Sequence, residues 1–344
     1  MSNPAGNIDN SLTDWHQKAR TLQSNINQTI LGQEQIIDLM VVAIFCRGHI
    51  LLEGDVGVGK TTLLRATAES LGGDFERIEG TIDLMPHDLI YYTHISNDGK
   101  PAVSEGPLLK HGQNLSIFFF NEINRARPQV HSLLLRAMAE RSITAFNKTF
   151  YFPHLQVFAD RNRIEKDETF ELPAAARDRF MMELQVTQPK AEQQLKELMF
   201  NTRYYDADKL VASAGKAVLP FTELNAIATT IQNQIHASKA IQDYGFHLCQ
   251  ALRRPQDYAI QLSDIDSNKL VSGGMGPRGI GYLAQSARAH AWLNQRQSVI
   301  PEDFHAVIRA ISKHRIFLNP VYNYNADAII EELISNVLNT IASP

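Results

Sequence analysis

The sequence predicts an α/β protein: an αβα sandwich built on a parallel sheet, followed by an all-α domain. Three observations predict this fold class. Between residues 49 and 186, short apolar runs alternate with amphipathic segments, as buried parallel strands and their connecting helices do. One strand-to-helix junction carries the pattern G-x-x-x-x-G-K-[ST]. After Val186 strand signals almost stop, and helical periodicity continues to the end of the chain.

Two helices are predicted before the first strand. The first has four apolar residues at helical spacing, and either Ser11 or Thr13 is a candidate N-cap for it. Its apolar residues are Trp15, Ala19, Leu22 and Ile26. The second helix is predicted at residues 33–45.

Five buried strands and two further helices are predicted in the sandwich. The strands are expected at residues 50–52, 75–78, 117–120, 155–159 and 181–186. One helix, at residues 62–71, follows the first strand. The other lies between the third and fourth strands, where an apolar stripe marks its buried face. That stripe consists of Val130, Leu133, Leu134, Ala137 and Met138.

Two hairpins interrupt this alternation. The first turns at residues 97–99, where Asp98-Gly99 suits a turn that needs positive φ. The second is predicted to turn at Asn147-Lys148, between apolar residues at 143–144 and 150–152.

A domain boundary is predicted at Gln188-Pro189, where the strand signals end. The chain then divides into an N-terminal helical segment (1–30), an αβα core (31–188) and a helical domain with a C-terminal helix (189–344). Apolar stripes predict two of the last domain's helices. One stripe is Ile280, Leu283, Ala284 and Ala287, and the other is Ile330, Leu333, Ile334, Val337, Leu338 and Ile341.

Length and composition restrict the class of protein. A chain of 344 residues favours two domains over one core. The formal net charge of -4 gives no basic field for nucleic acid or anionic membranes. The two cysteines, Cys46 and Cys249, suit a reducing compartment. The N-terminus lacks a secretory signal pattern, and the longest apolar run, residues 39–45, is too short to span a bilayer. A cytoplasmic protein without a transmembrane segment is therefore expected.

The G-x-x-x-x-G-K-[ST] pattern has the residue types that hold nucleotide phosphates. Because it lies between a strand and a helix, backbone N–H groups and the helix N-terminus would face the phosphate oxygens. Lys60 would reach the β- and γ-phosphates, and Thr61 would offer its hydroxyl to Mg²⁺. ATP and Mg²⁺ are the predicted cofactors. The predicted nucleotide-binding residues of this loop are Gly54, Asp55, Val56, Gly57, Val58, Gly59, Lys60, Thr61 and Thr62.

A second polar pair follows about 60 residues later, where an apolar strand ends in Asn121-Glu122. P-loop enzymes place their metal-and-water motif at this point. The carboxylate of Glu122 can orient and polarise an attacking water, so Glu122 and Lys60 are predicted catalytic residues. Asn121 keeps an oxygen for a Mg²⁺-bound water but lacks the charge of the usual Asp. Thr61 and, through water, Asn121 are the predicted metal contacts.

On these motifs the chain resembles the MoxR family of AAA+ ATPases, and the likeness covers nearly its whole length. The matching segments occur in the family's order. They are Leu31-Gly32-Gln33-Glu34, residues 81–89, Glu105-Gly106-Pro107-Leu108, residues 121–126 against D-E-I-N-R-A, residues 159–165 against A-T-Q-N-P-I-E, Leu172-Pro173 with Asp178-Arg179-Phe180, Gly276-Pro277-Arg278 against S-P-R, residues 300–303 and residues 314–316.

The resemblance implies further site residues. Gly32 would lie beside the adenine, and Asn162 would be the first sensor of the attacking water or γ-phosphate. Arg278, on the lid domain, would be the second sensor and would contact the nucleotide of its own subunit. Arg179 would reach the neighbouring subunit's γ-phosphate as an arginine finger. Asn162, Arg179 and Arg278 thus join the predicted catalytic residues, and catalysis would need a homo-oligomer, in AAA+ proteins usually a hexameric ring.

The chain departs from the family pattern around this site. Asn121 stands where the family has Asp, and Arg161 and Arg163 replace the Gln and Pro that flank the sensor Asn162. A polar segment at residues 257–272 is also longer than usual. Two hypotheses therefore stay open: an ATPase, and an ATP-binding scaffold or switch with little turnover.

The resemblance also implies a partner protein with a von Willebrand factor A domain, and a chaperone-like task of activation, assembly or metal-cofactor insertion. The two hairpins are candidate contacts for that partner or for the pore of a ring. Docking to a membrane-bound complex stays open. No nucleic-acid partner is expected. An ATPase acting on DNA has less support, because the chain has no G-A-F-T-G-A loop and no stretch of Lys and Arg with interleaved aromatics.

Overall fold

The computed structural model describes residues 5–162, 169–215, 218–263 and 265–344. The chain forms two compact units. The sheet unit comprises Gln17–Phe180 and Leu184–Asn225, and the helical unit comprises Met1–His16, Met181–Glu183 and Ala226–Pro344. The linear domain bounds proposed from the sequence stay a prediction.

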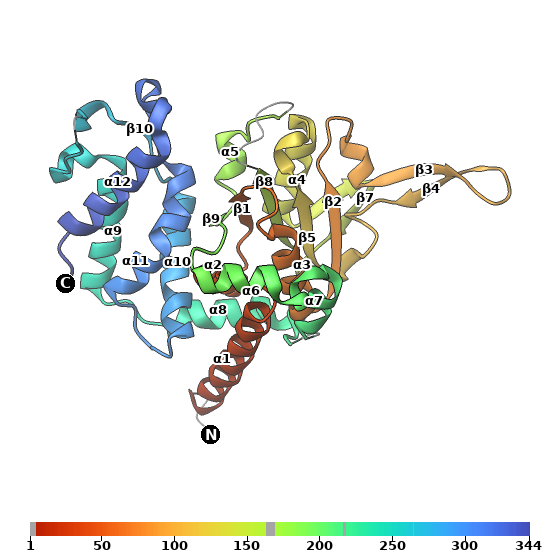
Figure 1. Cartoon of the computed structure of the whole chain (residues 1–344), viewed down its shortest axis with the longest axis horizontal. Coiled ribbons are helices and arrows are strands. Elements are labelled where there is room, and N and C mark those ends of the chain that lie inside the picture. Colours follow the sequence, from red (N-terminus) through yellow and green to blue (C-terminus); the bar gives the residue numbers. More distant parts are fainter. Residues whose placement is uncertain (1–4, 163–168, 216–217, 264) are drawn as a thin grey trace. The chain divides into compact units, whose positions relative to one another are not determined.

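A five-stranded parallel sheet forms the centre of the sheet unit (Figure 1), which confirms the predicted fold class. Its strand order is β2-β5-β8-β1-β9, so strands adjacent in the chain are not adjacent in the sheet. All five predicted strands are present. Their bounds are β1 (Ile50–Gly54), β2 (Asp74–Glu79), β5 (Leu115–Asn121), β8 (Gln156–Asn162) and β9 (Met182–Val186).

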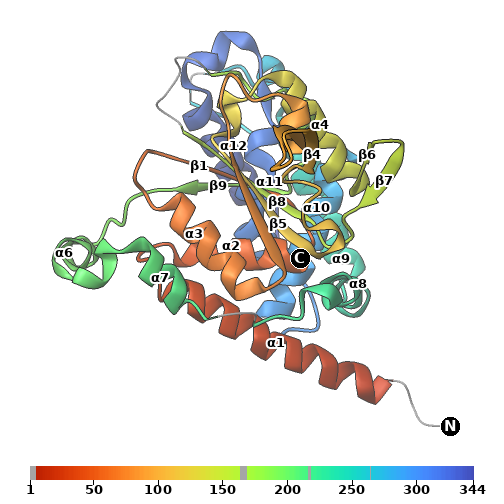
Figure 2. The ribbon, with the colours of Figure 1, turned by 90° about the vertical axis from the view of Figure 1, so that its right-hand side faces the viewer.

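Helices cover both faces of this sheet, with α2 and α3 on one side and α4 on the other (Figure 2). The predicted stripe of α4 packs on Leu51, Phe118 and Val157, which project from the same face of their strands. Full burial of such strands on both faces explains their nearly continuous apolar sequences. Helix α1 (Ala5–Asn27) is divided between the units, with its residues up to His16 in the helical unit and those from Gln17 in the sheet unit. The other helices of the sheet unit are α2 (Glu34–Phe45), α3 (Lys60–Leu71), α4 (Pro128–Glu140), α5 (Ala174–Arg177), α6 (Glu192–Phe200) and α7 (Ala207–Ser213).

The first helix begins earlier than the sequence predicts. Helix α1 starts at Ala5, so Ser11 and Thr13 lie inside it and neither is its N-cap. The apolar residues predicted for it are buried, from Trp15 near its middle to Ile26 close to its end. Apolar periodicity located the helix correctly, because the periodic residues pack, whereas the more polar first turns carry no such signal.

A buried histidine precedes β1. Nδ1 of His49 accepts a hydrogen bond from the amide of Val157 at 2.9 Å, and Nε2 lies 3.2 Å from the carbonyl oxygen of Met138. Burial, together with the charges of Arg141 and Arg47, lowers the pKa of His49 to about 3. His49 is therefore a neutral core residue that ties β1, β8 and α4 together.

Both predicted hairpins are present and antiparallel. The first, β3 (Tyr91–Ile95) with β4 (Pro101–Glu105), projects from the sheet unit as a narrow arm (Figure 1). The second pairs β6 (Ser142–Ala145) with β7 (Lys148–Tyr151). Its predicted turn is wrong by one residue: the turn residues are Phe146 and Asn147, with φ of 50° and 59°. Positive φ at both central residues is typical of a type I′ hairpin turn, which a Phe does not signal.

The helical unit consists mainly of α8 (Leu224–Gln234), α9 (Lys239–Arg253), α10 (Pro277–Leu293), α11 (Pro301–Ser312) and α12 (Ala326–Thr340). A small antiparallel sheet of β10 (Val271–Gly273) and β11 (Phe317–Leu318) was not predicted, because two- and three-residue strands carry almost no periodicity. Strand β10 lies at the end of the polar segment 257–272. Among the described helices, none is both long and apolar enough to cross a bilayer.

A buried ion cluster joins α10 and α11 in the helical unit. The carboxylate of Asp303 is fully buried and accepts two hydrogen bonds of 2.6 Å from Arg296. It also accepts one of 2.6 Å from His290 and one of 2.9 Å from the amide of Ile300. Burial alone would raise the pKa of Asp303, but the hydrogen bonds from His290 and Arg296 outweigh burial and hold it below its usual value.

Candidate functional site

The predicted phosphate loop connects β1 to α3 at the carboxyl end of the sheet. Gly57 and Gly59 have φ of 81° and 88°, which residues with a Cβ rarely adopt, so both glycines are needed for the shape of the loop. Gly54 has a different role, since a Cβ there would lie 2.3 Å from the carbonyl oxygen of Val186 on β9. Glycine at residue 54 thus permits strand packing, and glycines 57 and 59 permit the turn.

The ammonium of Lys60 is buried over this loop. Its Nζ donates to the carbonyl oxygens of Gly54 at 2.8 Å and Asp55 at 2.9 Å. It also donates to Oδ1 of Asn162 at 2.8 Å. The structure therefore brings the loop lysine and the predicted sensor together, although 102 residues separate them in the chain.

Glu122 follows β5 and lies beside the same sensor. Nδ2 of Asn162 donates to Oε1 of Glu122 at 3.0 Å, and Nε of Arg125 lies 2.9 Å from Oε2. Glu122 has left-handed backbone angles, φ 51° and ψ 49°, a conformation that costs energy for a residue with a side chain. Its backbone also passes so close to Gly80 that a Cβ on Gly80 would lie 2.2 Å from the carbonyl oxygen of Glu122.

Two carboxylates near Asn121 were not predicted as site residues. Oδ1 of Asp160 accepts a hydrogen bond of 2.6 Å from the amide of Glu122. Oε1 of Glu79 accepts one of 2.5 Å from Nδ2 of Asn121. Burial raises the pKa of Asp160 to about 6, although the bond from Glu122 and the charge of Lys60 lower it. The signal in the sequence for Asp160 was a charged residue directly after the apolar run Val157–Ala159 and two positions before Asn162.

These groups surround one polar hollow of about 340 Å³. Loop residues 56–62 form one wall, and side chains at the ends of β5 and β8 form the other. The second wall consists of Asn121, Glu122, Asp160 and Asn162. Backbone amides and Lys60 suit phosphate oxygens, while the hydroxyl of Thr61 and the amide and carboxylate oxygens suit Mg²⁺. Among the described residues, no group of three or more His, Cys, Asp and Glu is arranged as a metal cage. A Mg²⁺ ion held jointly with a nucleotide fits such a partial set.

Three other predicted site residues are not among those that line this hollow. Arg179 follows α5, and its Nη1 donates to the carbonyl oxygen of Ala175 at 2.9 Å. Arg278 is exposed in the first turn of α10, in the helical unit. Gly32 has a φ of 70°, and a Cβ there would lie 2.9 Å from Pro189. The roles of Arg179, Arg278 and Gly32 stay predictions.

Arg161 and Arg163 replace the family's Gln and Pro beside Asn162, and the structure describes only the first of them. Arg161 is the register partner of Glu53 and pairs with it at 3.4 Å, so it alternates with Asp160 and Asn162 and projects from the opposite face of β8. It therefore does not line the hollow. Arg163 lies outside the described residues, as do Ile164 and Glu165 of the same motif.

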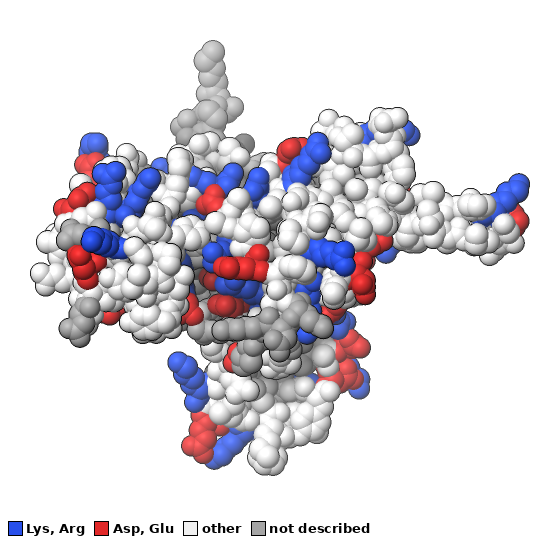
Figure 3. Space-filling model, turned by 90° about the horizontal axis from the view of Figure 1, so that it is seen from above, with Lys and Arg blue, Asp and Glu red and all other residues white. Residues whose placement is uncertain are grey.

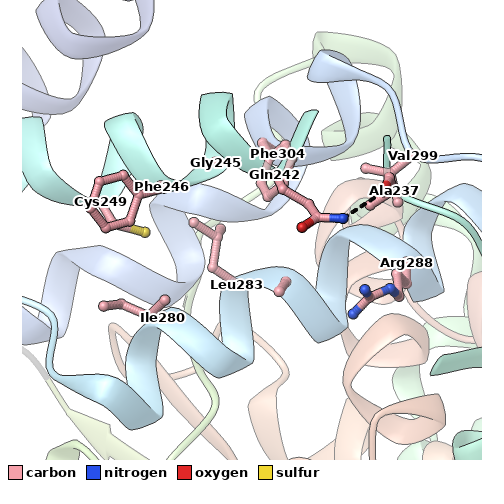
Figure 4. A pocket seen from close by; sticks show the side chains of 11 residues that line it. Ala237, Gln242, Gly245, Phe246, Cys249, Ile280, Leu283, Arg288, Val299 and Phe304 are labelled. Atoms are coloured by element: carbon pink, nitrogen blue, oxygen red, sulfur yellow. Dashed lines mark hydrogen bonds between the residues drawn. The ribbon is translucent and has the colours of Figure 1, made fainter. Parts of the chain in front are cut away.

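A second hollow, of about 300 Å³, lies within the helical unit between α9, α10 and α11 (Figure 4). Its lining is mostly apolar and includes Phe246, Leu283 and Phe304, with the guanidinium of Arg288 near one end. Burial raises the pKa of Cys249 in this hollow to about 12, so its thiol is not a nucleophile near neutral pH. Of these two hollows, the one beside the phosphate loop brings together charged and polar groups predicted for chemistry.

A parallel sheet with a phosphate loop after β1 and polar residues after β5 and β8 defines a P-loop nucleotide-binding protein. Comparison with known proteins agrees. Residues 49–182 match the ATPase family associated with various cellular activities (AAA), and residues 264–333 match the AAA lid domain. The crystal structure of a protein from Cytophaga hutchinsonii superposes with a TM-score of 0.84 at 26% identity over 99% of both chains.

Named relatives of similar length identify the family more closely. The chain is 50% identical to Protein MoxR of Paracoccus denitrificans over 98% of this chain and 99% of that one. It is 51% identical to Protein MoxR of Methylorubrum extorquens over 98% of both chains. Chaperone MoxR1 of Mycobacterium tuberculosis is 33% identical over 99% of this chain and 86% of its own. The chain belongs to the MoxR family of AAA ATPases.

Proposed function

We propose that this protein binds ATP with Mg²⁺ in the hollow beside the phosphate loop and hydrolyses it between adjacent subunits. The observation that carries the proposal is the continuous hydrogen-bonded path from Lys60 through Asn162 to Glu122. This path joins the residue that would bind the γ-phosphate to the carboxylate that would activate water. Such a connection positions the nucleophile relative to the phosphate, which is the main contribution of a protein to phosphoryl transfer.

Separate residues are proposed to bind the phosphates, to activate water and to hold Mg²⁺. Loop amides and Lys60 bind the phosphates, while Glu122, held by Asn162 and Arg125, orients and polarises the attacking water. Thr61 and, through water, Asn121 would hold Mg²⁺, which would neutralise negative charge on the phosphates. Loop residues 54–62 and Gly32 would surround the nucleotide, and Arg278 would contact it from the lid. In this proposal residues 31–188 are the ATPase core and residues 189–344 the lid.

Arg179 supplies the proposed dependence on an oligomer, which in AAA proteins is usually a hexamer. As an arginine finger it would act on the nucleotide of a neighbouring subunit, so two inactive variants should complement each other. Lys60→Ala should lose nucleotide binding, and Arg179→Ala should keep binding but lose turnover. Mixed oligomers place an intact Arg179 against an intact loop at some interfaces. Phosphate release should therefore return on mixing, and its absence in oligomers shown to be mixed would reject the finger role.

We further propose that hydrolysis remodels or activates a partner protein in a chaperone-like manner. The support is the similarity to Chaperone MoxR1, and the family resemblance suggests a partner with a von Willebrand factor A domain. The β3–β4 arm is the proposed contact, because its exposed side chains include the apolar Tyr92, Ile95 and Val103. On the face shown in Figure 3 its flanks are largely uncharged, while elsewhere opposite charges are interspersed. Deleting residues 97–100 should abolish partner binding and stimulation of ATP hydrolysis while leaving basal phosphate release unchanged.

A second function is favoured by one observation, the neutral side chain of Asn121. With weaker Mg²⁺ binding the protein would hold ATP as a structural ligand and serve as a scaffold or switch. Steady-state phosphate release separates the two functions. An ATPase should lose turnover in Glu122→Gln. For a switch, Glu122→Gln should change nothing and Asn121→Asp should create activity.

A further inference from the structure

Three polar side chains end three adjacent strands beside the phosphate loop. Glu79 on β2 and Asn121 on β5 are register partners. Asp160 on β8 follows Ala159, which is the register partner of Phe120, so Asp160 lies alongside Asn121. Register partners on parallel strands project from the same face of a sheet. The carboxyl end of the sheet thus carries a row of acid, amide and acid.

The middle position of this row is suited to an amide. Nδ2 of Asn121 donates to Glu79 at 2.5 Å, and an ionised carboxylate in the same place has no hydrogen to donate. An Asp at position 121 would also put three carboxylates side by side, and like charges at neighbouring strand positions repel. A neutral residue at position 121 therefore avoids repulsion with the charged Asp160 on the next strand. The family motif has Thr at the position of Asp160.

The two acids of the row differ in their surroundings. Glu79 is exposed, and its other oxygen already pairs with Arg77 at 2.9 Å. Asp160 is only 2% exposed and lines the hollow together with Lys60 and Thr61. A buried carboxylate acts on a nearby cation much more strongly than an exposed and paired one. Asp160 is thus the stronger source of negative charge at the site.

We propose that Asp160 provides the carboxylate charge toward nucleotide-bound Mg²⁺ that position 121 lacks. The negative charge is carried by Asp160 on β8 and not by residue 121 on the adjacent strand β5. This inference rests on the proposed function, because it concerns the Mg²⁺ that accompanies ATP. A carboxylate beside the water shell of Mg²⁺ raises the affinity for the ion, so Asp160 would support metal-dependent nucleotide binding although residue 121 is Asn.

A purely structural role for Asp160 makes a different prediction. Its Oδ1 holds the amide of Glu122 at 2.6 Å and so stabilises a left-handed backbone. Asp160→Asn keeps an oxygen acceptor for that amide, but it removes the charge and replaces the other carboxylate oxygen by an NH₂ group. Combining Asp160→Asn with Asn121→Asp places the negative charge on β5 instead. The double variant therefore restores Mg²⁺ binding only if the role of Asp160 is to supply negative charge.

The test is calorimetric titration of ADP at a series of free Mg²⁺ concentrations, at pH 8, with the full-length chain. Asp98→Asn, which makes the same change at the exposed tip of the β3–β4 arm, is the matched control. Asp160→Asn is expected to need about tenfold more Mg²⁺ to reach half of the Mg²⁺-dependent gain in ADP affinity. Metal-free ADP binding should not weaken. The double variant should return to within about threefold of the wild type, as should Asp98→Asn.

Unchanged Mg²⁺ dependence in Asp160→Asn, or no restoration in the double variant, overturns the inference. If wild-type protein does not bind ADP at millimolar Mg²⁺, the proposed function itself is wrong, so the two failures are distinct. Thermal unfolding checks that each variant folds. Should Asp160→Asn not fold, Asp160→Ser, which also keeps an oxygen near the Glu122 amide, must show the same loss for the inference to stand.

Discussion

The buried ion cluster of the helical unit allows a stability prediction that can be worked out from its geometry. Asp303→Asn replaces one carboxylate oxygen by an NH₂ group, which then faces an N–H donor of Arg296. Breaking a buried ion pair on one side costs about 3–5 kcal/mol. We expect the lower end, about 3 kcal/mol, because His290 and Arg296 are 22% and 29% exposed and can regain some hydration. With a urea m-value of about 2 kcal/mol/M, the midpoint should fall by about 1.5 M.

Tryptophan fluorescence is a suitable assay because it follows this unit alone. The chain has two tryptophans, and both Trp15 and Trp292 are buried residues of the helical unit. Asp243→Asn is the control, since Asp243 pairs with Lys239 at 3.2 Å on the exposed surface of α9. Its loss should cost less than about 0.5 kcal/mol.

The sign of the pH dependence provides a second check of the same reasoning. The folded pKa of Asp303 is depressed, so its contribution is complete above the usual value of about 3.9 and is lost as pH falls through the folded pKa. The difference between wild type and Asp303→Asn should be constant from pH 7 to about pH 5 and should shrink in stronger acid. A midpoint shift no larger than that of Asp243→Asn would refute the reasoning.

Three further predictions test other parts of the molecule. When the pH falls from 7 to 5, His49 should lower the unfolding free energy of the sheet unit by about 2 kcal/mol. The reason is that the imidazole takes up a proton below about pH 6.5 in the unfolded chain but only near pH 3 in the folded protein. His49→Gln should remove that share of the pH dependence in urea titrations followed by circular dichroism. Gly281→Ala should raise helical-unit stability by about 0.5–1 kcal/mol, since a Cβ there meets nothing within 4 Å. Gly245→Ala, also inside a helix, should instead lower the fluorescence-detected midpoint, because its Cβ would lie 2.7 Å from the ring of Phe304.

The fold was predictable because the central strands β1, β5 and β8 are largely buried. Continuous apolar runs such as Ile117–Phe120 leave little choice of structure, and their alternation with helices indicates a parallel sheet. The edge strand β2 is partly exposed and has a weaker apolar signal. Features with little burial were missed. The turn at Phe146 and Asn147 depends on two backbone angles, and β10 and β11 are too short to show a period.

The candidate site was predictable where its residues are contiguous in the chain. The phosphate loop and Asn121-Glu122 each form a local pattern, and the structure places both beside one hollow. Asp160 was missed because its importance comes from its neighbours on β1 and β5 and not from nearby sequence. Glu79 was missed for the same reason. A single sequence does not reveal which strand ends are adjacent, and the strand order supplied that information.

Gly80 has a consequence for anyone who alters this protein by design or by selection. Its lack of a side chain lets the main chain of Glu122 pass within 2.2 Å of where a Cβ would be. A mutant library restricted to the residues that line the hollow would omit position 80, yet even alanine there should displace the Glu122 carboxylate. The methyl group of an alanine at position 80 would thus move the Glu122 carboxylate without replacing any side chain that lines the hollow.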